Sequence, residues 1–227
     1  MHYIDEGTGP VVLCFHGNPT WCYFYRNLIR ELRGSFRVIA PDFLGCGLSD
    51  RTPGKRFRAI DRINQLEEFV KALGIDRFSV VMHDWGGPLG TGFLLRRLDS
   101  VDRIVYLNTT LTETEALPGF IKLAATPIIG KAFTRHTDTF VRLTTSMGAY
   151  TKLTPEVIDG YRAPYTTRQR RDAIWDFVDD IPFDSSHPTY SQMVEIAAGL
   201  PKVAEKPVKI VWGLQDPCFH REMLSKV

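Results

Sequence analysis

The sequence predicts an α/β fold in which a mostly parallel sheet is flanked by helices, and two observations support this prediction. Over the first half of the chain, short apolar runs typical of buried strands alternate with segments of helical periodicity. The clearest case is residues 78–98, where an apolar run leads through a glycine-flanked turn into a helical segment. Because strand–helix–strand units bring successive strands together in parallel, this alternation predicts one parallel sheet.

The first elements can be assigned in chain order. Residues 2–7 are typical of the end of a strand that enters a turn, and the apolar run 11–15 is typical of a buried strand. A helix capped by Thr20 is expected over residues 21–32. A short strand, 37–40, then leads into a loop rich in glycine.

An amphipathic helix is predicted between residues 59 and 73, because apolar side chains recur there at helical spacing and would pack on the sheet. The side chains of this stripe are Ile60, Ile63, Leu66, Phe69, Val70 and Leu73. Gly74 ends the helix. A strand over 78–81, a helix over 89–98 and a strand over 101–107 continue the alternation.

After residue 110 the alternation stops, and residues 112–200 show helix signals without a convincing strand pattern. Residues 154–156 combine a capping Thr, a first-turn Pro and an acidic first turn. Residues 166–178 and 188–200 each carry an apolar face.

These patterns divide the chain into three segments. We expect residues 1–110 to form the first part of the core and residues 111–204 to form a helical cap, or lid, over the sheet. Residues 205–227 return to the core, beginning with a strand at 209–212.

The turn at residues 82–88 has the form of a nucleophile elbow, in which a strained turn between a strand and a helix presents one reactive side chain. Asp84 occupies the apex, so its carboxylate would attack the substrate and form an ester on the enzyme. The alternative is that Asp84 only caps the following helix. The chemical interpretation is favoured because residues 16–21, 84–87 and 108–110 all follow strands, and ligands bind beyond the carboxyl ends of parallel strands.

Composition excludes several classes of function. Hydrophobic residues make up 44% of the chain and charged residues 24%, and the net charge of +2 gives no reason to expect nucleic acid as a partner. No apolar stretch is long enough to cross a bilayer and no leader opens the chain, so we expect a cytoplasmic protein without a membrane partner.

Arg168, Arg170 and Arg171 are expected on a solvated helix face. The cysteines lack metal-ligand spacing, so we expect reduced thiols, no metal and no cofactor; they are Cys14, Cys22, Cys46 and Cys218.

Several motifs together resemble the haloalkane dehalogenases of the α/β-hydrolase fold. They are His-Gly-Asn-Pro-Thr-Trp at 16–21, His-Asp-Trp-Gly-Gly at 83–87, Trp-Gly-Leu-Gln-Asp-Pro at 212–217, the Ala-Pro-Asp loop at 40–50, and two cap segments at 161–165 and 180–182. The resemblance covers nearly the whole chain. The motif around Asp84 is also shared with epoxide hydrolases, and Asn18 and Trp21 favour the dehalogenases.

The resemblance implies a role for each motif. Asp84 would displace a halide from carbon, and the Asn18 amide and the Trp85 indole would bind the departing halide ion, because a bare anion in an apolar pocket is costly. Their backbone N–H groups would form the oxyanion hole for ester hydrolysis. The acid of this family follows one of two strands; Asn108 after the earlier one is not acidic, so Asp216 is assigned as the acid. Asp216 is also explicable as a turn residue before Pro217.

The resemblance also implies a water-activating histidine beyond a further strand, and here the sequence departs from the family pattern. Because only 11 residues follow Asp216, we expect a fragment that lacks this histidine loop as well as its first strand. His220 follows the acid in the right order but too closely. His16 and His83 are interpreted as structural, and His136 and His187 as solvated cap residues. Without the base, the ester on Asp84 is expected to persist.

The expected partner is a small apolar halogenated substrate together with its halide ion. Candidate residues for the substrate pocket are Phe120, Phe133, Phe140 and Phe177. Two alternatives remain at this point. One is an epoxide hydrolase, for which the cap offers tyrosine donors at Tyr150, Tyr161, Tyr165 and Tyr190. The other is a non-catalytic remnant that binds apolar molecules, or that aggregates through an exposed sheet edge.

Overall fold

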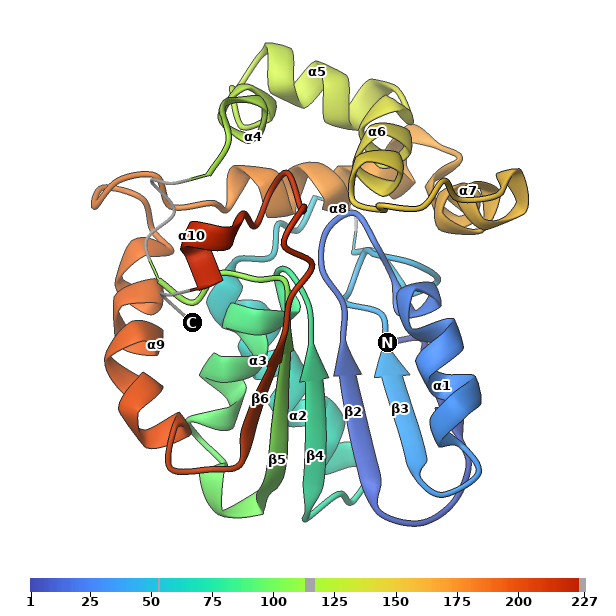
Figure 1. Cartoon of the computed structure of the whole chain (residues 1–227). Coiled ribbons are helices and arrows are strands. Elements are labelled where there is room, and N and C mark those ends of the chain that lie inside the picture. The colour runs from blue at the N-terminus through green and yellow to red at the C-terminus, as the bar shows by residue number, and fades with distance from the viewer. Residues whose placement is uncertain (53, 113–116, 225–227) are drawn as a thin grey trace.

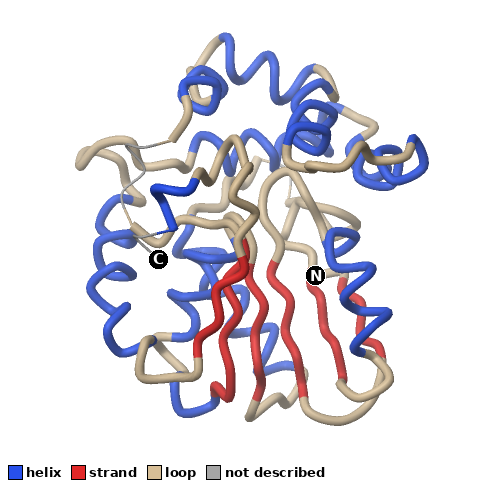
Figure 2. Tube along the Cα trace, viewed as in Figure 1, coloured by secondary structure: helices blue, strands red, loops and turns tan. Residues whose placement is uncertain are grey.

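The computed structural model describes residues 1–52, 54–112 and 117–224, which form a six-stranded sheet, helices on both of its faces and a helical cap (Figures 1 and 2). The order across the sheet is β1-β3-β2-β4-β5-β6. Strand β1 is antiparallel to β3, and every other neighbouring pair is parallel, which confirms the predicted fold class. The strands are β1 Tyr3–Glu6, β2 Val11–Phe15, β3 Arg37–Pro41, β4 Phe78–Met82, β5 Val101–Leu107 and β6 Val208–Val211.

The alternation of side chains along the central strands builds a core on each face of the sheet. Leu13 and Phe15 of β2 point toward one face, where they join α2 Ala59–Ala72 and α3 Gly86–Leu94. Val12 and Cys14 point toward the other face, which is covered by the 3₁₀ turn η1 Cys22–Tyr25 and by α1 Arg26–Leu32. The helix predicted over 21–32 therefore begins as a 3₁₀ turn. The helix predicted over 89–98 begins earlier, at Gly86, because the chain turns directly from the elbow into it.

The cap covers the end of the sheet where the parallel strands finish (Figure 1). Helix α8 lies across this end, and α4, α5 and α6 lie above α8. Helices α5 and α8 pack against each other around a small apolar core that includes Val141 and Ile174. The cap elements are α4 Gly119–Ala124, α5 Ile129–His136, α6 Thr139–Met147, α7 Pro155–Arg162, η3 Ala163–Tyr165 and α8 Arg168–Asp179.

The cap is shorter than the segment 111–204 expected from the sequence, because α9 Tyr190–Val203 belongs to the core. Its side chains Met193, Ile196 and Val203 are buried with the sheet residues. Helices α3 and α9 pack against each other so closely that a Cβ atom at Gly199 would collide with the side chain of Leu95. The apolar face predicted for residues 188–200 is present, but it packs against α3 and the core instead of covering the end of the sheet.

In the basic cluster at the start of α8, Arg168 is exposed as expected, whereas Arg171 differs from its expected solvated position. Arg171 is buried, and its guanidinium donates hydrogen bonds to the carbonyl oxygens of Arg135, His136 and Tyr165 at 2.8–3.2 Å. Two of these carbonyls end α5, where a cation is favoured by the unpaired C=O groups. Arg171 therefore fixes α5 to α8.

Strand β6 lies at the edge of the sheet, and all four of its residues are exposed. Apolar β6 side chains exposed by 37–49% include Val208, Ile210 and Val211. Among the helices of the described ranges, none combines the length and apolar character needed to cross a membrane.

Candidate active site

Asp84 is held at the apex of a strained turn between β4 and α3. Its φ angle is +51°, which is the left-handed region that few side chains other than Asn and Asp adopt. Glycines allow the neighbouring backbone to approach, since a Cβ at Gly17 would collide with the Asp84 side chain and one at Gly86 with the Phe15 carbonyl. The expected nucleophile elbow is therefore present in the geometry of the chain.

The backbone of Asp84 is fixed by the end of β5. Its N–H donates to the Asn108 carbonyl at 2.9 Å, and its carbonyl accepts from the Thr109 hydroxyl at 2.7 Å. The Oδ1 atom of Asp84 accepts the backbone N–H of Asn18 at 2.6 Å. One carboxylate oxygen is thus held beside the end of β2.

Burial raises the pKa of Asp84 from its usual 3.8 to about 7. Hydrogen bonds from the backbone N–H groups of Trp85 and Asn18 oppose this rise, and the negative charge of Asp216 adds to it. The carboxylate is therefore costly to ionise at this position, which is typical of a site that uses the group for chemistry.

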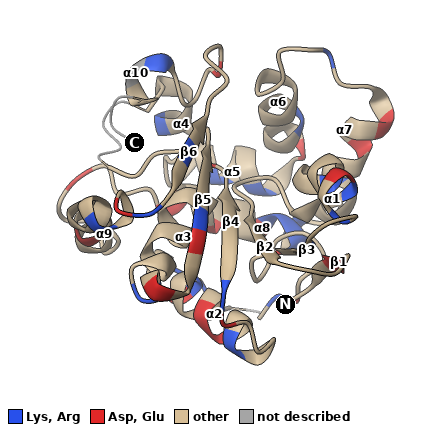
Figure 3. Ribbon diagram, turned by 60° about the horizontal axis from the view of Figure 1, so that its bottom comes forward, with Lys and Arg blue, Asp and Glu red and all other residues tan. Residues whose placement is uncertain are grey.

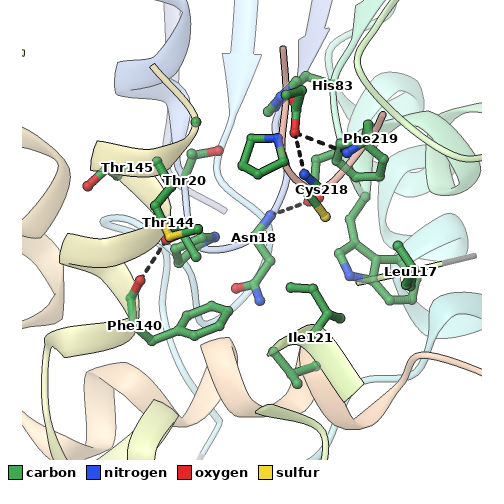
Figure 4. Close-up of a pocket in the computed structure, with 18 of the residues that line it drawn as sticks. Asn18, Thr20, His83, Leu117, Ile121, Phe140, Thr144, Thr145, Cys218 and Phe219 are labelled. Atoms are coloured by element: carbon green, nitrogen blue, oxygen red, sulfur yellow. Dashed lines mark hydrogen bonds between the residues drawn. The ribbon is translucent and has the colours of Figure 1, made fainter. Parts of the chain in front are cut away.

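The side chain of Asp84 borders a cavity of about 290 Å³ between the sheet and the cap (Figure 4). The wall is mostly apolar. Figure 4 shows the amide of Asn18 between the Phe140 and Ile121 side chains. Cap residues that line the cavity include Leu117, Phe120, Ile121, Phe140, Thr144, Thr145, Met147 and Leu153.

Only part of the predicted pocket set faces this cavity. Phe120 and Phe140 line it, whereas Phe133 and Phe177 do not belong to its lining. Phe133 packs edge-on against Phe140 with ring centroids 6.1 Å apart. Phe177 is fully buried against Trp85, with centroids 5.5 Å apart, so it supports the indole from behind.

Several lining residues were missed because the short cap helices α4 and α6 were not assigned from the sequence. On α6, Phe140, Thr144 and Met147 recur at helical spacing and face the same cavity. A search for i, i+4, i+7 spacing in residues 139–147 could have found this face.

Trp85 and Asn18, the expected halide-binding pair, both line the cavity next to Asp84. The Asn18 side-chain N–H₂ donates to the Ile174 carbonyl on α8 at 3.2 Å, which orients the amide. Its Oδ1 atom is buried without a partner among the described residues. A buried acceptor without a partner is rare, and an N–H or O–H group of a bound molecule would satisfy it.

Asp216 also lines the cavity, and its hydrogen bonds are those of the turn residue considered as the alternative. Its Oδ1 atom accepts the backbone N–H groups of Cys218 and Phe219 at 2.7 and 3.0 Å, as in a turn residue. At the same time its charge raises the pKa of Asp84, which places the two carboxylates within electrostatic reach of each other.

Asn108 joins the loops that carry the two carboxylates. Its amide donates to the Gly213 carbonyl at 3.0 Å and accepts the Gly213 N–H at 2.8 Å. Its own carbonyl accepts the N–H of Asp84. Asn108 therefore holds the loop that carries Asp216 against the elbow.

An Asn108→Ala substitution is expected to lower the free energy of unfolding by about 1–3 kcal/mol, because it leaves the Gly213 N–H and C=O without their partners. Urea denaturation measures this loss. The matched control is Asn64→Ala, since exposed Asn64 accepts one hydrogen bond, from Arg96. Equal costs for the two variants would show that the Asn108–Gly213 pair does not brace the loops.

The histidines have different surroundings. In the part of the chain that the structure describes, His83 is the histidine that lines the cavity; it stacks on Phe24 at 4.2 Å, and burial followed by the charge of His16 lowers its pKa to about 3. His16 is fully buried, makes hydrogen bonds with the Gly17 carbonyl and the Phe43 N–H, and supports the loop after β2. His220 is not among the lining residues.

The cap histidines differ from each other. His136 is exposed, as expected. His187 is half-buried, with its ring nitrogens 3.1 Å from the Asp179 carbonyl and 3.2 Å from the Thr189 N–H. The expectation that both are solvated is therefore wrong for His187, because the loop before α9 folds onto its ring.

One further cluster has ligand-type atoms close together. Those of His2, Cys22 and Asp42 all lie within 4.8 Å of one another. The Asp42 carboxylate already accepts N–H groups from Cys22, Leu48 and the His2 ring at 2.7–2.9 Å. This cluster braces the loop after β3 and has no unused carboxylate oxygen to offer a metal.

A sequence profile described as the alpha/beta hydrolase fold matches residues 10–227. The chain belongs to the α/β-hydrolase family. Among curated proteins, it is 35% identical to a cis-3-alkyl-4-alkyloxetan-2-one decarboxylase of Shewanella oneidensis, over 100% of this chain and 73% of that protein. It is 34% identical to haloalkane dehalogenase 2 of Mycobacterium tuberculosis, over 97% of this chain and 76% of that protein.

Solved structures agree with this assignment. A putative ancestral haloalkane dehalogenase superposes with a TM-score of 0.83 at 26% identity, covering 93% of this chain and 86% of that one. A haloalkane dehalogenase from Bradyrhizobium elkani shares the fold with a TM-score of 0.83 at 23% identity, covering 94% and 87% of the two chains. The present α/β hydrolase is thus a haloalkane dehalogenase-like hydrolase, as the motifs predicted.

Proposed function

We propose that this hydrolase cleaves carbon–halogen bonds of small apolar haloalkanes through an ester on Asp84. The observation that carries the proposal is the Asp84 carboxylate at the apex of the elbow, with Oδ1 held by the Asn18 N–H and the side chain bordering the cavity. A mostly apolar cavity borders this carboxylate, as an alkyl substrate requires.

In the first step, the second carboxylate oxygen of Asp84 donates an electron pair to the carbon that bears the halogen. A C–O bond forms as the C–halogen bond breaks, and the halide leaves with the electrons of that bond. The Asn18 amide and the Trp85 indole supply N–H donors for the halide, because both line the same cavity. The backbone N–H of Asn18 remains on Oδ1, where charge develops when water attacks the ester.

Ester hydrolysis requires a base that removes a proton from water. Among the described residues that line the cavity, His83 offers the only imidazole, and its lowered pKa of about 3 makes it a weak base. We therefore expect alkylation of Asp84 to be faster than hydrolysis in this 227-residue chain. The ester would accumulate.

Incubation with 1-bromobutane followed by intact-mass measurement tests this. One added butyl group per chain, with one equivalent of bromide, is the expected result. An unmodified chain that also releases no bromide would refute carbon–halogen cleavage, and continuous bromide release would refute the accumulation of the ester.

The rate of butyl labelling is expected to rise as the pH increases through about 7. Only the ionised carboxylate attacks carbon, and burial holds the pKa of Asp84 near this value. Labelling followed by mass spectrometry between pH 5 and pH 9 would show a rate that rises about tenfold per pH unit below pH 7 and is constant above it (roughly, for one titrating group). A rate that is constant over this range would place the nucleophile elsewhere.

A second candidate function is favoured by the oxetanone decarboxylase relative, which is as similar to this chain as the dehalogenases are. The same carboxylate could attack C4 of a dialkyl oxetan-2-one, with the ring oxygen leaving as a carboxylate. Loss of CO₂ would then form the C=C bond and expel Asp84, so this reaction regenerates the nucleophile without a water-activating base.

The two candidates are separated by their products and turnover. On a cis-3,4-dialkyl oxetan-2-one, many equivalents of alkene and CO₂ per chain would support decarboxylation. On 1-bromobutane, one equivalent of bromide would support dehalogenation. The epoxide hydrolase alternative is weaker, because of its four candidate tyrosines only Tyr161 lines the cavity. The Tyr161 hydroxyl also receives a hydrogen bond from Arg26, and the Tyr165 hydroxyl is buried between Gly47 and Thr20.

A further inference from the structure

The outer surface of the cap exposes large apolar side chains around the cavity. On α4, Phe120 and Leu123 are one helical turn apart and both are exposed; on α6, Leu143 and Met147 are likewise one turn apart and exposed. Phe120 and Met147 also line the cavity. The cavity therefore reaches the surface between two exposed apolar pairs.

Two further side chains extend this surface where α4 meets α5. Ile128 is 83% exposed and Ile129 is 64% exposed, which are extreme values for isoleucine in a folded domain. Helices α4 and α5 pack together at this point, and both lie at the end of the molecule opposite the lower ends of the strands (Figure 1). We call the six side chains the cap apex; they are Phe120, Leu123, Ile128, Ile129, Leu143 and Met147.

The charge around the cap apex is positive. Residues 117–153 contain five Lys or Arg and one Asp, with no Glu; Glu113 and Glu115 precede them outside the described residues. Figure 3 shows basic segments on α4 and α5. Lys122, Arg142 and Lys152 are exposed and form no ion pair within the described part of the chain, whereas the single Asp138 is paired with Arg162.

We propose that the cap apex docks on the surface of an anionic lipid bilayer. Exposed aliphatic side chains in a segment that also carries unpaired Lys and Arg match an interface that offers acyl chains below a layer of negative head groups. A symmetric contact between two copies through this surface would instead bring like charges together. The earlier expectation of no membrane partner rested on the absence of a spanning segment, and docking on the surface needs none.

Docking of this kind gives the cavity a route for apolar compounds. A substrate with alkyl chains concentrates in the lipid phase, and Phe120 and Met147 place the cavity opening at the docked surface. The docking itself does not depend on the chemistry at Asp84. An Asp84→Asn chain is expected to bind vesicles as well as the parent does, so failure of the proposed reaction and failure of docking are distinguishable.

Vesicle flotation tests the proposal with two compositions, phosphatidylcholine alone and phosphatidylcholine mixed with phosphatidylglycerol. The chain is expected to float with the anionic vesicles only. An Ile128→Ser/Ile129→Ser variant should lose at least about tenfold in partition coefficient, because two aliphatic side chains no longer enter the interface. Lys122→Gln should lose about fivefold.

The matched control is Leu48→Ser/Val194→Ser, which removes two side chains, each 51% exposed, outside the cap apex. This control should bind like the parent, and thermal melting of all variants should confirm that they are folded. No binding to anionic vesicles, equal binding to both compositions, or equal loss in the control would overturn the proposal. Concentration-dependent self-association that disappears in the Ile128→Ser/Ile129→Ser variant would show that a second copy covers the apex instead.

Discussion

An Asp84→Asn chain is expected to take up no butyl group from 1-bromobutane under conditions in which the parent chain takes up one. The amide oxygen of Asn is a far weaker nucleophile than a carboxylate oxygen, and nothing else at the elbow can replace it. The substitution keeps the side-chain shape and the oxygen that accepts the Asn18 N–H. Intact-mass measurement gives the result, and peptide mapping of the labelled parent should place the butyl group on Asp84.

Cys218 provides the necessary control for this experiment. Its thiol lines the same cavity and is the obvious competing site of alkylation. Burial and the charges of Asp84 and Asp216 raise the pKa of the Cys218 thiol, so it remains protonated and unreactive at neutral pH. A Cys218→Ser chain should therefore be labelled like the parent. Labelling that persists in Asp84→Asn and disappears in Cys218→Ser would assign the alkylation to the thiol.

The fold and the elbow could be predicted from the sequence because both depend on local patterns. The run Phe78–Met82 has the apolar character of a central strand, and Gly86 after Asp84 is required because a Cβ there would collide with the backbone of Phe15. That Asn18 and Trp85 lie near Asp84 could also be predicted, because β2 and β4 are parallel neighbours and finish at one edge of the sheet.

The cap could be predicted only in outline, because its helices have two apolar environments to satisfy. Phe140 lines the cavity and also belongs to the cap core in which its neighbour Val141 is buried. Helical spacing can identify the face of α6 that carries Phe140, but it does not show whether that face meets a cavity or a core. Phe177 and Ile196 show the same ambiguity, since each belongs to a face that packs on the sheet core rather than on the substrate cavity. Which surface a helix buries is decided by tertiary packing and not by its own spacing.

Replacing Asp84 by Asn should also stabilise the chain, and only above acidic pH. The unfolded carboxyl ionises near pH 4, whereas burial raises the pKa of Asp84 in the folded chain to about 7. Between these values the folded state binds more protons than the unfolded state, so the free energy of unfolding of the parent falls as the pH rises from about 4 to about 7. The Asn variant has no such group and does not lose this stability.

The expected gain for Asp84→Asn is therefore near zero at pH 4 and reaches a constant value above pH 7. The pKa difference corresponds to about 4 kcal/mol. Asp84 is half-buried beside a cavity that reaches the surface, where water screens its charge, so we expect a gain in the free energy of unfolding of about 1–3 kcal/mol. Urea denaturation of both chains at pH 4, 6 and 8 measures the difference, with the exposed Asp99→Asn change as a control that should gain nothing at pH 8. If Asp84→Asn were less stable than the parent at pH 8, the Asp84 carboxylate would be a stabilising anion with satisfied partners. A nucleophile held ready at a cost to the fold requires the opposite sign.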